Sequence, residues 1–338
     1  MGLRVNLQQE TEKQWQQWRQ KLNEAGLSIP QEAEFHQAAL KVWEASDYVV
    51  QCALRYLELL PDLYRDGDLN RSFNEGEMSQ RLALVLESVS DETGLSHILR
   101  EFRRRQMVRI IWRDLAGLAP LDETLEDLSA LADSCIDRAL QKLYAWFCDQ
   151  MGTPRNQEGE AQSLVVLGMG KLGARELNLS SDIDLIFAYP EGGQTDGVRQ
   201  FTNEQFFIRL CQRLVQVLDN HTGDGFVFRV DTRLRPFGSA GPLAMSFAAM
   251  ESYYGSQGRE WERYAMIKAR VVAGDSRAGD ELMALLRPFV YRRYLDFGAI
   301  ESLREMKQLI SNELHKKGME ANIKLGPGGI REIEFIGQ

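Results

Sequence analysis

The first 160 residues carry apolar side chains at the spacing of amphipathic helices. Leu82, Leu86 and Val89 recur three or four positions apart, and the same spacing returns between residues 125 and 135. Glycine is sparse in this region, whereas glutamine, glutamate, leucine and alanine dominate. We therefore expect residues 1–160 to form a mostly helical N-terminal region.

After a polar stretch at residues 152–159, which is typical of a linker, the pattern changes to strands alternating with helices. Short apolar or alternating segments predict strands at 164–167, 181–187 and 226–231. Helical spacing predicts helices at 203–218, 247–254, 259–272 and 297–317.

These patterns divide the chain into three expected regions: the helical residues 1–160, a core of strands and helices at 161–290 and a helical segment at 291–338. The last segment stops in mid-pattern, without a helix-ending signal. We therefore expect the chain to be part of a longer protein.

Composition narrows the class of protein. The 338 residues carry a formal net charge of −9, whereas nucleic-acid-binding proteins usually have a basic excess. The four cysteines lie far apart, without metal-ligand spacing, as expected of reduced thiols. The N-terminus lacks the apolar segment of a secretory signal, and no window reaches the length of about 18 apolar residues that a membrane span needs. We expect a soluble, cytoplasmic protein that binds neither nucleic acid nor membrane.

Two aspartates stand at the start of the second predicted strand. Successive side chains of a strand point to opposite faces, so Asp182 and Asp184 share one face. A third acid, Asp231, lies on the third predicted strand, between Arg229 and Arg233. A solvated edge strand would explain one such acid, but several aspartates are disfavoured in strands and repel one another unless cations lie between them. The three carboxylates predict a site for two Mg²⁺ ions that hold phosphate oxygens.

A glycine-rich segment, Gly168-Met169-Gly170-Lys171-Leu172-Gly173, follows the first predicted strand. It matches the G-x-G-x-x-G pattern of dinucleotide-binding folds. Such a fold needs a crossover of about a dozen residues, whereas only residues 174–181 separate this segment from Asp182. A Walker loop is also excluded, because no Gly-Lys-Ser/Thr occurs. The segment therefore favours a different kind of phosphate site.

Further motifs accompany these two features. They are Glu176-Leu177-Asn178, Ser181-Asp182-Ile183-Asp184-Leu185, Val230-Asp231-Thr232-Arg233-Leu234-Arg235-Pro236, Trp261-Glu262-Arg263-Tyr264-Ala265-Met266 and Ile330-Arg331-Glu332-Ile333-Glu334-Phe335. The combination resembles the glutamine synthetase adenylyltransferase family of the nucleotidyltransferase superfamily, and more closely the amino-terminal of its two tandem copies. The Ala174-Arg175 pair departs from the pattern, because family members often have glycine there.

The resemblance implies an α+β fold: a polymerase-beta-like nucleotidyltransferase core with a small mixed sheet, embedded between mostly α-helical regions. It implies an adenylyl-tyrosine phosphorylase, in which inorganic phosphate removes AMP from adenylylated glutamine synthetase as ADP. The PII signalling protein is the second implied partner. The residues expected to contact nucleotide and phosphate are Gly168, Gly170, Lys171, Gly173, Ser181, Arg233 and Arg235, with Asp182, Asp184 and Asp231 as catalytic metal ligands.

Two alternative functions stay open. The same carboxylates would serve adenylylation of glutamine synthetase from ATP, because both directions need the same metal site. A PII-binding regulatory module without catalysis is the second alternative.

Overall fold

The computed structural model describes residues 2–28, 30, 32–291 and a few isolated positions between 304 and 333. The chain forms two compact units whose segments alternate along the sequence. The first unit comprises Met1–Leu143, Arg175–Ile183 and Arg213–Val230, and the second comprises Tyr144–Ala174, Asp184–Gln212 and Asp231–Gln338. The helix predicted at 297–317 lies outside the described residues.

Helices fill the N-terminal part of the chain, as the apolar spacing predicts. They are α1 (Gly2–Glu24), α2 (Ala33–Ala45), α3 (Asp47–Arg55), α4 (Leu59–Arg65), α5 (Glu77–Leu86), α6 (Glu92–Ala116) and α7 (Leu121–Met151). Local signals set the bounds of α6: the Asp91 side chain accepts from the Gly94 N–H at its start, and Gly117 ends it in the left-handed conformation. None of the helices in the described part of the chain is long and apolar enough to cross a membrane.

An aromatic cluster holds α1, α2 and α6 together in the first unit. The Trp15 and Trp18 rings lie 5.0 Å apart, and each packs against the edge of Trp43 on α2. Phe35, also on α2, stacks on Trp112 of α6 at 5.1 Å. Large buried rings bring much apolar area together, and tilted or edge contacts suit their quadrupoles.

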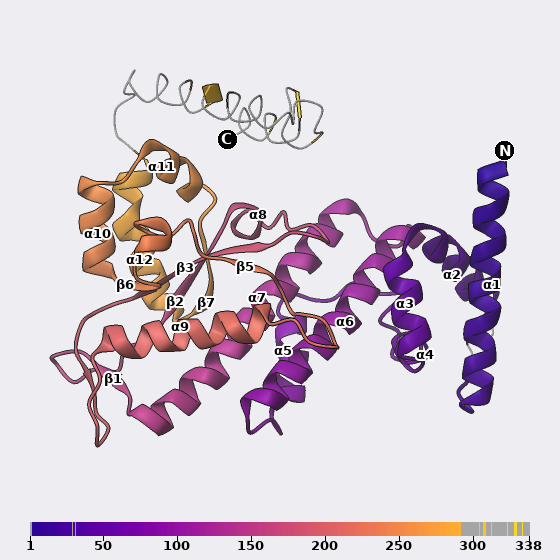
Figure 1. Cartoon of the computed structure of the whole chain (residues 1–338), viewed down its shortest axis with the longest axis horizontal. Coiled ribbons are helices and arrows are strands. Elements are labelled where there is room, and N and C mark those ends of the chain that lie inside the picture. The colour runs from indigo at the N-terminus through magenta and orange to yellow at the C-terminus, as the bar shows by residue number, and fades with distance from the viewer. Residues whose placement is uncertain are drawn as a thin grey trace. The chain divides into compact units, whose positions relative to one another are not determined.

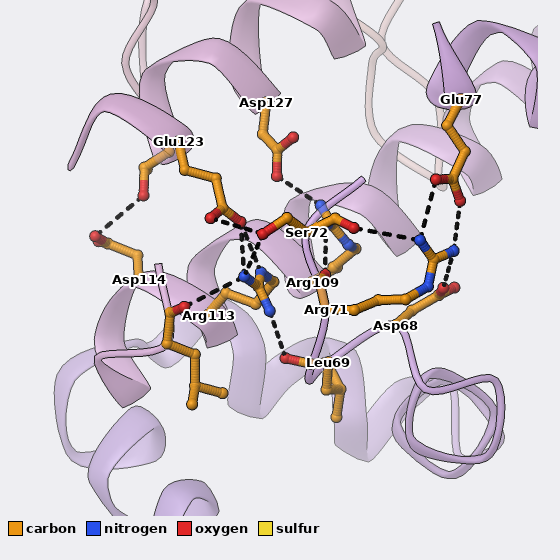
Figure 2. A network of polar contacts seen from close by, with 12 residues as sticks. Asp68, Leu69, Arg71, Ser72, Glu77, Arg109, Arg113, Asp114, Glu123 and Asp127 are labelled. Atoms are coloured by element: carbon orange, nitrogen blue, oxygen red, sulfur yellow. Dashed lines mark hydrogen bonds and ion pairs between the residues drawn. The ribbon is translucent and has the colours of Figure 1, made fainter. Parts of the chain in front are cut away.

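A buried ion-pair network fastens the connection between α4 and α5 to helices α6 and α7 (Figure 2). Arg109 is fully buried, and it donates to Asp127 Oδ2 at 2.6 Å and to the Arg71 carbonyl at 3.0 Å. Arg113 donates to Glu123 Oε1 at 2.7 Å and to the Leu69 carbonyl at 3.2 Å. Each guanidinium therefore joins a carboxylate of α7 to a backbone carbonyl of the connection, as its fork of donors allows.

The second unit contains a mixed sheet with the strand order β5-β3-β2-β7, and β6 pairs with β3. Its strands are β2 (Val165–Met169), β3 (Ile183–Tyr189), β5 (Val230–Asp231), β6 (Ala244–Ser246) and β7 (Arg270–Gly274). β2 runs antiparallel to both β3 and β7, whereas β6 runs parallel to β3. Every residue of β2 is buried, as its unbroken apolar sequence predicts.

Three helices accompany this sheet: α10 (Phe247–Ser256), α11 (Glu260–Met266) and α12 (Ser276–Val290). Met250 and Leu282 from these helices join Val165 and Leu167 of β2 in one buried apolar cluster. Figure 1 shows α12 beside β2 and β7, with α10 packed against α12. The second unit thus contains the small mixed sheet that the sequence predicts, together with helices in an α+β arrangement.

Two predicted elements of the second half differ from the structure. The helix predicted at 259–272 ends at Met266, and β7 follows, because this β-branched segment pairs along β2, with Val271 opposite Leu167 and Val272 at a register shift. The strand predicted at 226–231 is confined to Val230–Asp231, whereas the helix predicted at 203–218 is confirmed as α9 (Asn203–Asp219).

The polar stretch at 152–159 is not an open linker. It contains β1 (Pro154–Arg155), which pairs antiparallel with β4 (Gln194–Thr195). The backbone also approaches closely beside this pair of strands. A Cβ on Gly152, which precedes β1, would lie 2.1 Å from the backbone nitrogen of Gly197, which follows β4. Glycine and proline mark turns as well as linkers, which is why composition alone did not distinguish the two.

The buried pair of Arg109 and Asp127 yields a stability prediction. Arg109→Met leaves the Asp127 carboxylate buried without its cation, so we expect the free energy of unfolding to fall by about 3–5 kcal/mol. Urea unfolding of the variant and of the Arg109→Met/Asp127→Leu double variant measures this effect. The double variant should recover most of the loss, because it no longer buries an unpaired charge. Equal losses in both would contradict the assignment of the cost to that charge.

Candidate functional site

The glycine-rich segment is not an open loop. Gly168 and Met169 belong to β2, and Gly170–Gly173 form a single helical turn, α8. A Cβ on Gly173 would lie 1.7 Å from the Lys268 carbonyl oxygen, and one on Gly168 would lie 2.6 Å from Val272 Cγ1. Glycine is therefore needed at both positions for close packing against the segment that leads into β7. Lys171 lies half-buried on the same turn.

Arg270 at the start of β7 holds the same turn from its C-terminal end. Its guanidinium donates to the Leu172 carbonyl at 3.0 Å and to the Gly173 carbonyl at 3.2 Å. These carbonyls stand at the end of the α8 turn, where no further turn of helix donates N–H groups to them. The turn is thus anchored to β7 by packing and by hydrogen bonds.

The middle glycine of the segment faces one of the predicted metal ligands. Gly170 has a φ of +54°, and a Cβ there would lie 3.4 Å from Asp184 Oδ2. Asp184 is half-buried on β3, with its Cα paired with that of Met169. Glycine at 170 permits the left-handed backbone and leaves room beside this carboxylate.

Asp231 lies at the end of β5, which is the neighbour of β3 in the sheet. Its carboxylate is half-buried and accepts hydrogen bonds from the Arg233 backbone N–H at 2.8 Å and from Arg233 Nε at 2.8 Å. The hydrogen bond to the Arg233 side chain holds the pKa of Asp231 below its usual value. The Arg233 side chain itself is 77% exposed.

Arg235 takes a different position from the one the sequence suggests. Its guanidinium donates to the Thr232 carbonyl at 2.8 Å, to the Ser239 carbonyl at 3.3 Å and to the Gly241 carbonyl at 3.2 Å. Arg235 Nε also donates to the Gly241 carbonyl at 3.2 Å. The side chain therefore closes the loop of residues 232–241, which we call the Arg235 loop, rather than extending toward an incoming phosphate.

Asp182 and Ser181 belong to the first unit. Asp182 is exposed and directly precedes β3, so the predicted strand begins two residues later than expected. The Ser181 hydroxyl donates to Asn178 Oδ1 at 2.7 Å. Arg229 spans this segment, because its side chain donates to the Ser180 carbonyl and its own carbonyl accepts from the Ile183 N–H at 2.9 Å. Asn178 belongs to the Glu176-Leu177-Asn178 motif, but the motif alone does not indicate this hydrogen bond to Ser181.

The departure at residue 175 has a local consequence. Arg175 adopts a φ of +57°, a backbone conformation that glycine adopts without steric cost. Its side chain forms an ion pair with Glu126 of α7 within the first unit. The sequence thus places a bulky residue where the backbone requires the left-handed conformation.

The described residues contain no group of three or more histidine, cysteine or acidic side chains arranged to hold a metal ion. Asp184 and Asp231 nevertheless lie on neighbouring strands, and carboxylate oxygen is the donor that Mg²⁺ prefers. Mg²⁺ is commonly bound through one or two carboxylates, with substrate phosphates and water completing its octahedron. The residues fit an ion held in that way, and they do not form a closed cage of three acids.

Comparisons with known proteins bear on this site. The family model described as glutamate-ammonia ligase adenylyltransferase matches residues 36–284, and the model for GlnD PII-uridylyltransferase matches residues 304–338. The bifunctional glutamine synthetase adenylyltransferase/adenylyl-removing enzyme of Nitrosococcus oceani is 61% identical over 299 residues, which cover 88% of this chain and 31% of that protein. The Pseudomonas aeruginosa enzyme of the same name is 60% identical over 300 residues, covering 88% and 30%. The chain therefore spans about a third of the length of these relatives.

Substitution of Gly173 tests whether this position requires glycine for close packing. Gly173→Ala should lower the free energy of unfolding by about 1–3 kcal/mol, because its Cβ collides with backbone that cannot move freely. Gly192→Ala is the matched control, since a Cβ there meets nothing within 4 Å. Thermal and urea unfolding of both variants measure the difference. Normal stability of Gly173→Ala would contradict the packing role.

Arg235 and Arg233 form a matched pair on one loop. Arg235→Lys cannot reproduce the fork of hydrogen bonds, so the loop should open more easily by about 1–3 kcal/mol. Hydrogen exchange of the Arg235 and Gly238 amides, both bonded within the loop, measures this opening. Arg233→Lys should leave their protection unchanged, because the hydrogen bonds described for the Arg233 side chain go to Asp231 and not to the loop carbonyls that Arg235 contacts. Equal protection in all three proteins would show that Arg235 does not organise the loop.

Proposed function

The chain belongs to the glutamate-ammonia ligase adenylyltransferase family, and from that premise we propose that it removes AMP from an adenylylated tyrosine of glutamine synthetase. The observation that carries the proposal is the Asp184 carboxylate beside the Gly170 turn, with Asp231 at the end of the neighbouring strand. The mixed sheet around them supports a polymerase-beta-like nucleotidyltransferase core. The resemblance of the flanking motifs to the amino-terminal copy supports removal rather than addition of AMP.

The proposed reaction is a phosphorolysis. An oxygen of inorganic phosphate attacks the phosphorus of the adenylyl group, and the bond from that phosphorus to the tyrosine oxygen breaks. The adenylyl group leaves as ADP, and the tyrosinate takes up a proton. Because a phenol has a pKa of about 10, tyrosinate is a tolerable leaving group. Phosphate is already an anion at neutral pH, so repulsion between two anions is the main obstacle rather than the lack of a base.

The residues of the chain would meet this obstacle by position and charge. Asp184 and Asp231 would hold Mg²⁺, with Asp182 two positions before Asp184 as a further ligand. Bound Mg²⁺ would supply the positive charge that offsets repulsion between the phosphate and the phosphodiester. The exposed guanidinium of Arg233 is the candidate for contact with the incoming phosphate. Backbone of residues 168–173, with Lys171 and Ser181, is proposed to lie against the phosphates.

The comparisons also support proposals about partners. Glutamine synthetase is named in the relatives, and we take its adenylylated form as the substrate. The match of residues 304–338 to the PII-uridylyltransferase model supports a PII signalling protein as a second partner. Those residues lie almost entirely outside the described part of the chain.

Asp184→Asn tests the proposed site directly. We expect the rate of ADP formation from adenylylated glutamine synthetase, phosphate and Mg²⁺ to fall at least about a hundredfold, since even outer-shell changes cost 10–100-fold at metal sites. The melting temperature should stay the same or rise, because one charge leaves a group of like charges.

Asp280→Asn is the control, since Asp280 is an exposed acid on α12 of the same unit. It should keep the full rate. Near-normal ADP release by Asp184→Asn would contradict the assignment of this carboxylate. AMP transfer from ATP to unmodified glutamine synthetase, without ADP release from the adenylylated form, would instead assign the opposite direction to this chain.

A further inference from the structure

Phe237 combines two features that rarely occur together on a bulky residue. Its ring is 47% exposed, and its backbone has a φ of +61°. The left-handed conformation costs a residue with a large side chain about 1–3 kcal/mol, and it persists only where the surroundings hold it. Local stability therefore does not explain why an exposed aromatic residue keeps a strained backbone conformation.

Phe237 packs against a second aromatic residue whose position is itself fixed. Its ring packs against Tyr253 of α10 at 4.5 Å between centroids, with 61° between the planes. The Tyr253 hydroxyl donates to Glu262 Oε1 at 2.8 Å, and Glu262 is buried. The other oxygen of Glu262 accepts from the Arg259 N–H at 2.9 Å, at the start of α11. The Phe237 ring thus has an edge-type contact with Tyr253, whose hydroxyl is held in turn by the buried Glu262.

The Arg235 loop fixes Phe237 from within the chain. Two successive turns connect it to the strand end, with the Arg235 N–H bonded to the Thr232 carbonyl and the Gly238 N–H bonded to the Arg235 carbonyl. Each such turn keeps its first and fourth Cα atoms within about 7 Å. The two turns fold residues 232–238 back on themselves, so Phe237 stands on a folded loop that begins directly after Asp231.

From these observations we propose that Phe237 is the platform on which the adenine of the adenylyl group stacks. This inference rests on the proposed function, since it places the base of the same nucleotide whose phosphorus reacts near Asp231. An aromatic residue that is 47% exposed and held by an aromatic neighbour suits stacking, because every base presents a π-face. The strained backbone is then part of a binding site set up before the ligand arrives.

Of the two aromatic groups on the reacting phosphorus, adenine suits this position better than tyrosine. The phenol ring is joined to the phosphorus through one oxygen, so it must lie directly beside the carboxylates. Adenine is separated from the phosphorus by the ribose, as Phe237 is separated from Asp231 by two turns. The platform therefore selects for the nucleoside rather than for the amino acid.

Titration of the 338-residue chain with ADP tests the proposal. Phe237→Leu keeps apolar volume but removes the ring, and we expect the Kd for ADP to rise about tenfold, the effect of one lost base–aromatic stack. Phe237→Tyr keeps the ring and should bind ADP as the unchanged chain does. If Phe237→Leu does not fold, Phe237→Asn replaces it, because asparagine tolerates the left-handed backbone. Both ring-free variants should show the same weakening.

Three outcomes would overturn the proposal. An unchanged Kd for ADP in the ring-free variants would show that the base does not contact Phe237. Equal weakening in Phe237→Tyr would show that the effect comes from the loop and not from stacking. A raised KM for adenylylated glutamine synthetase with an unchanged Kd for ADP would assign the ring to the protein substrate. ADP binding is measured without turnover, so the base site is tested even if phosphorolysis is not observed.

Discussion

The close approach of the Gly170–Gly173 turn to β7 is the contact on which the second unit depends. It lets β2 end in a tight turn against Lys268 instead of continuing into a loop. Because β2 is also the partner of β3, the position of this turn determines where the Asp184 carboxylate lies. Three nearby glycines therefore meet two different requirements. Gly168 and Gly173 permit close packing, and Gly170 leaves room beside the Asp184 carboxylate.

Much of the fold could be predicted from local pattern. Helical spacing predicted a mostly helical region over residues 1–160, where α1–α7 lie, and α9 individually, and the apolar run predicted β2, because each element buries one continuous set of side chains. The segment after Met266 was mistaken for helix, since its strand character comes from pairing with β2, about a hundred residues earlier. Periodicity within a window contains no information about such distant pairing.

The roles of the acids and cations of the site stay predictions, whereas the positions of their side chains are given by the structure. Asp184 and Asp231 lie on neighbouring strands, but Asp182 precedes β3, so the alternation that predicted a shared strand face for Asp182 and Asp184 does not extend to residue 182. The Arg235 side chain donates to carbonyls of its own loop, and neither composition nor spacing indicates such contacts. Phe237 carried no signal in composition or spacing, since its importance lies in a backbone angle that only the folded chain reveals.

The alternation of the two units along the sequence has a consequence for synthesis of the protein. The first unit contains the N-terminal helices, yet its last segment ends at Val230, so it is incomplete when those helices leave the ribosome. The sheet of the second unit likewise waits for β7, which ends at Gly274. Long-range pairing of this kind slows folding, because distant segments must meet before their contacts stabilise them. Nascent chains shorter than about 274 residues therefore expose the edge of β2, which makes chaperone protection during translation valuable.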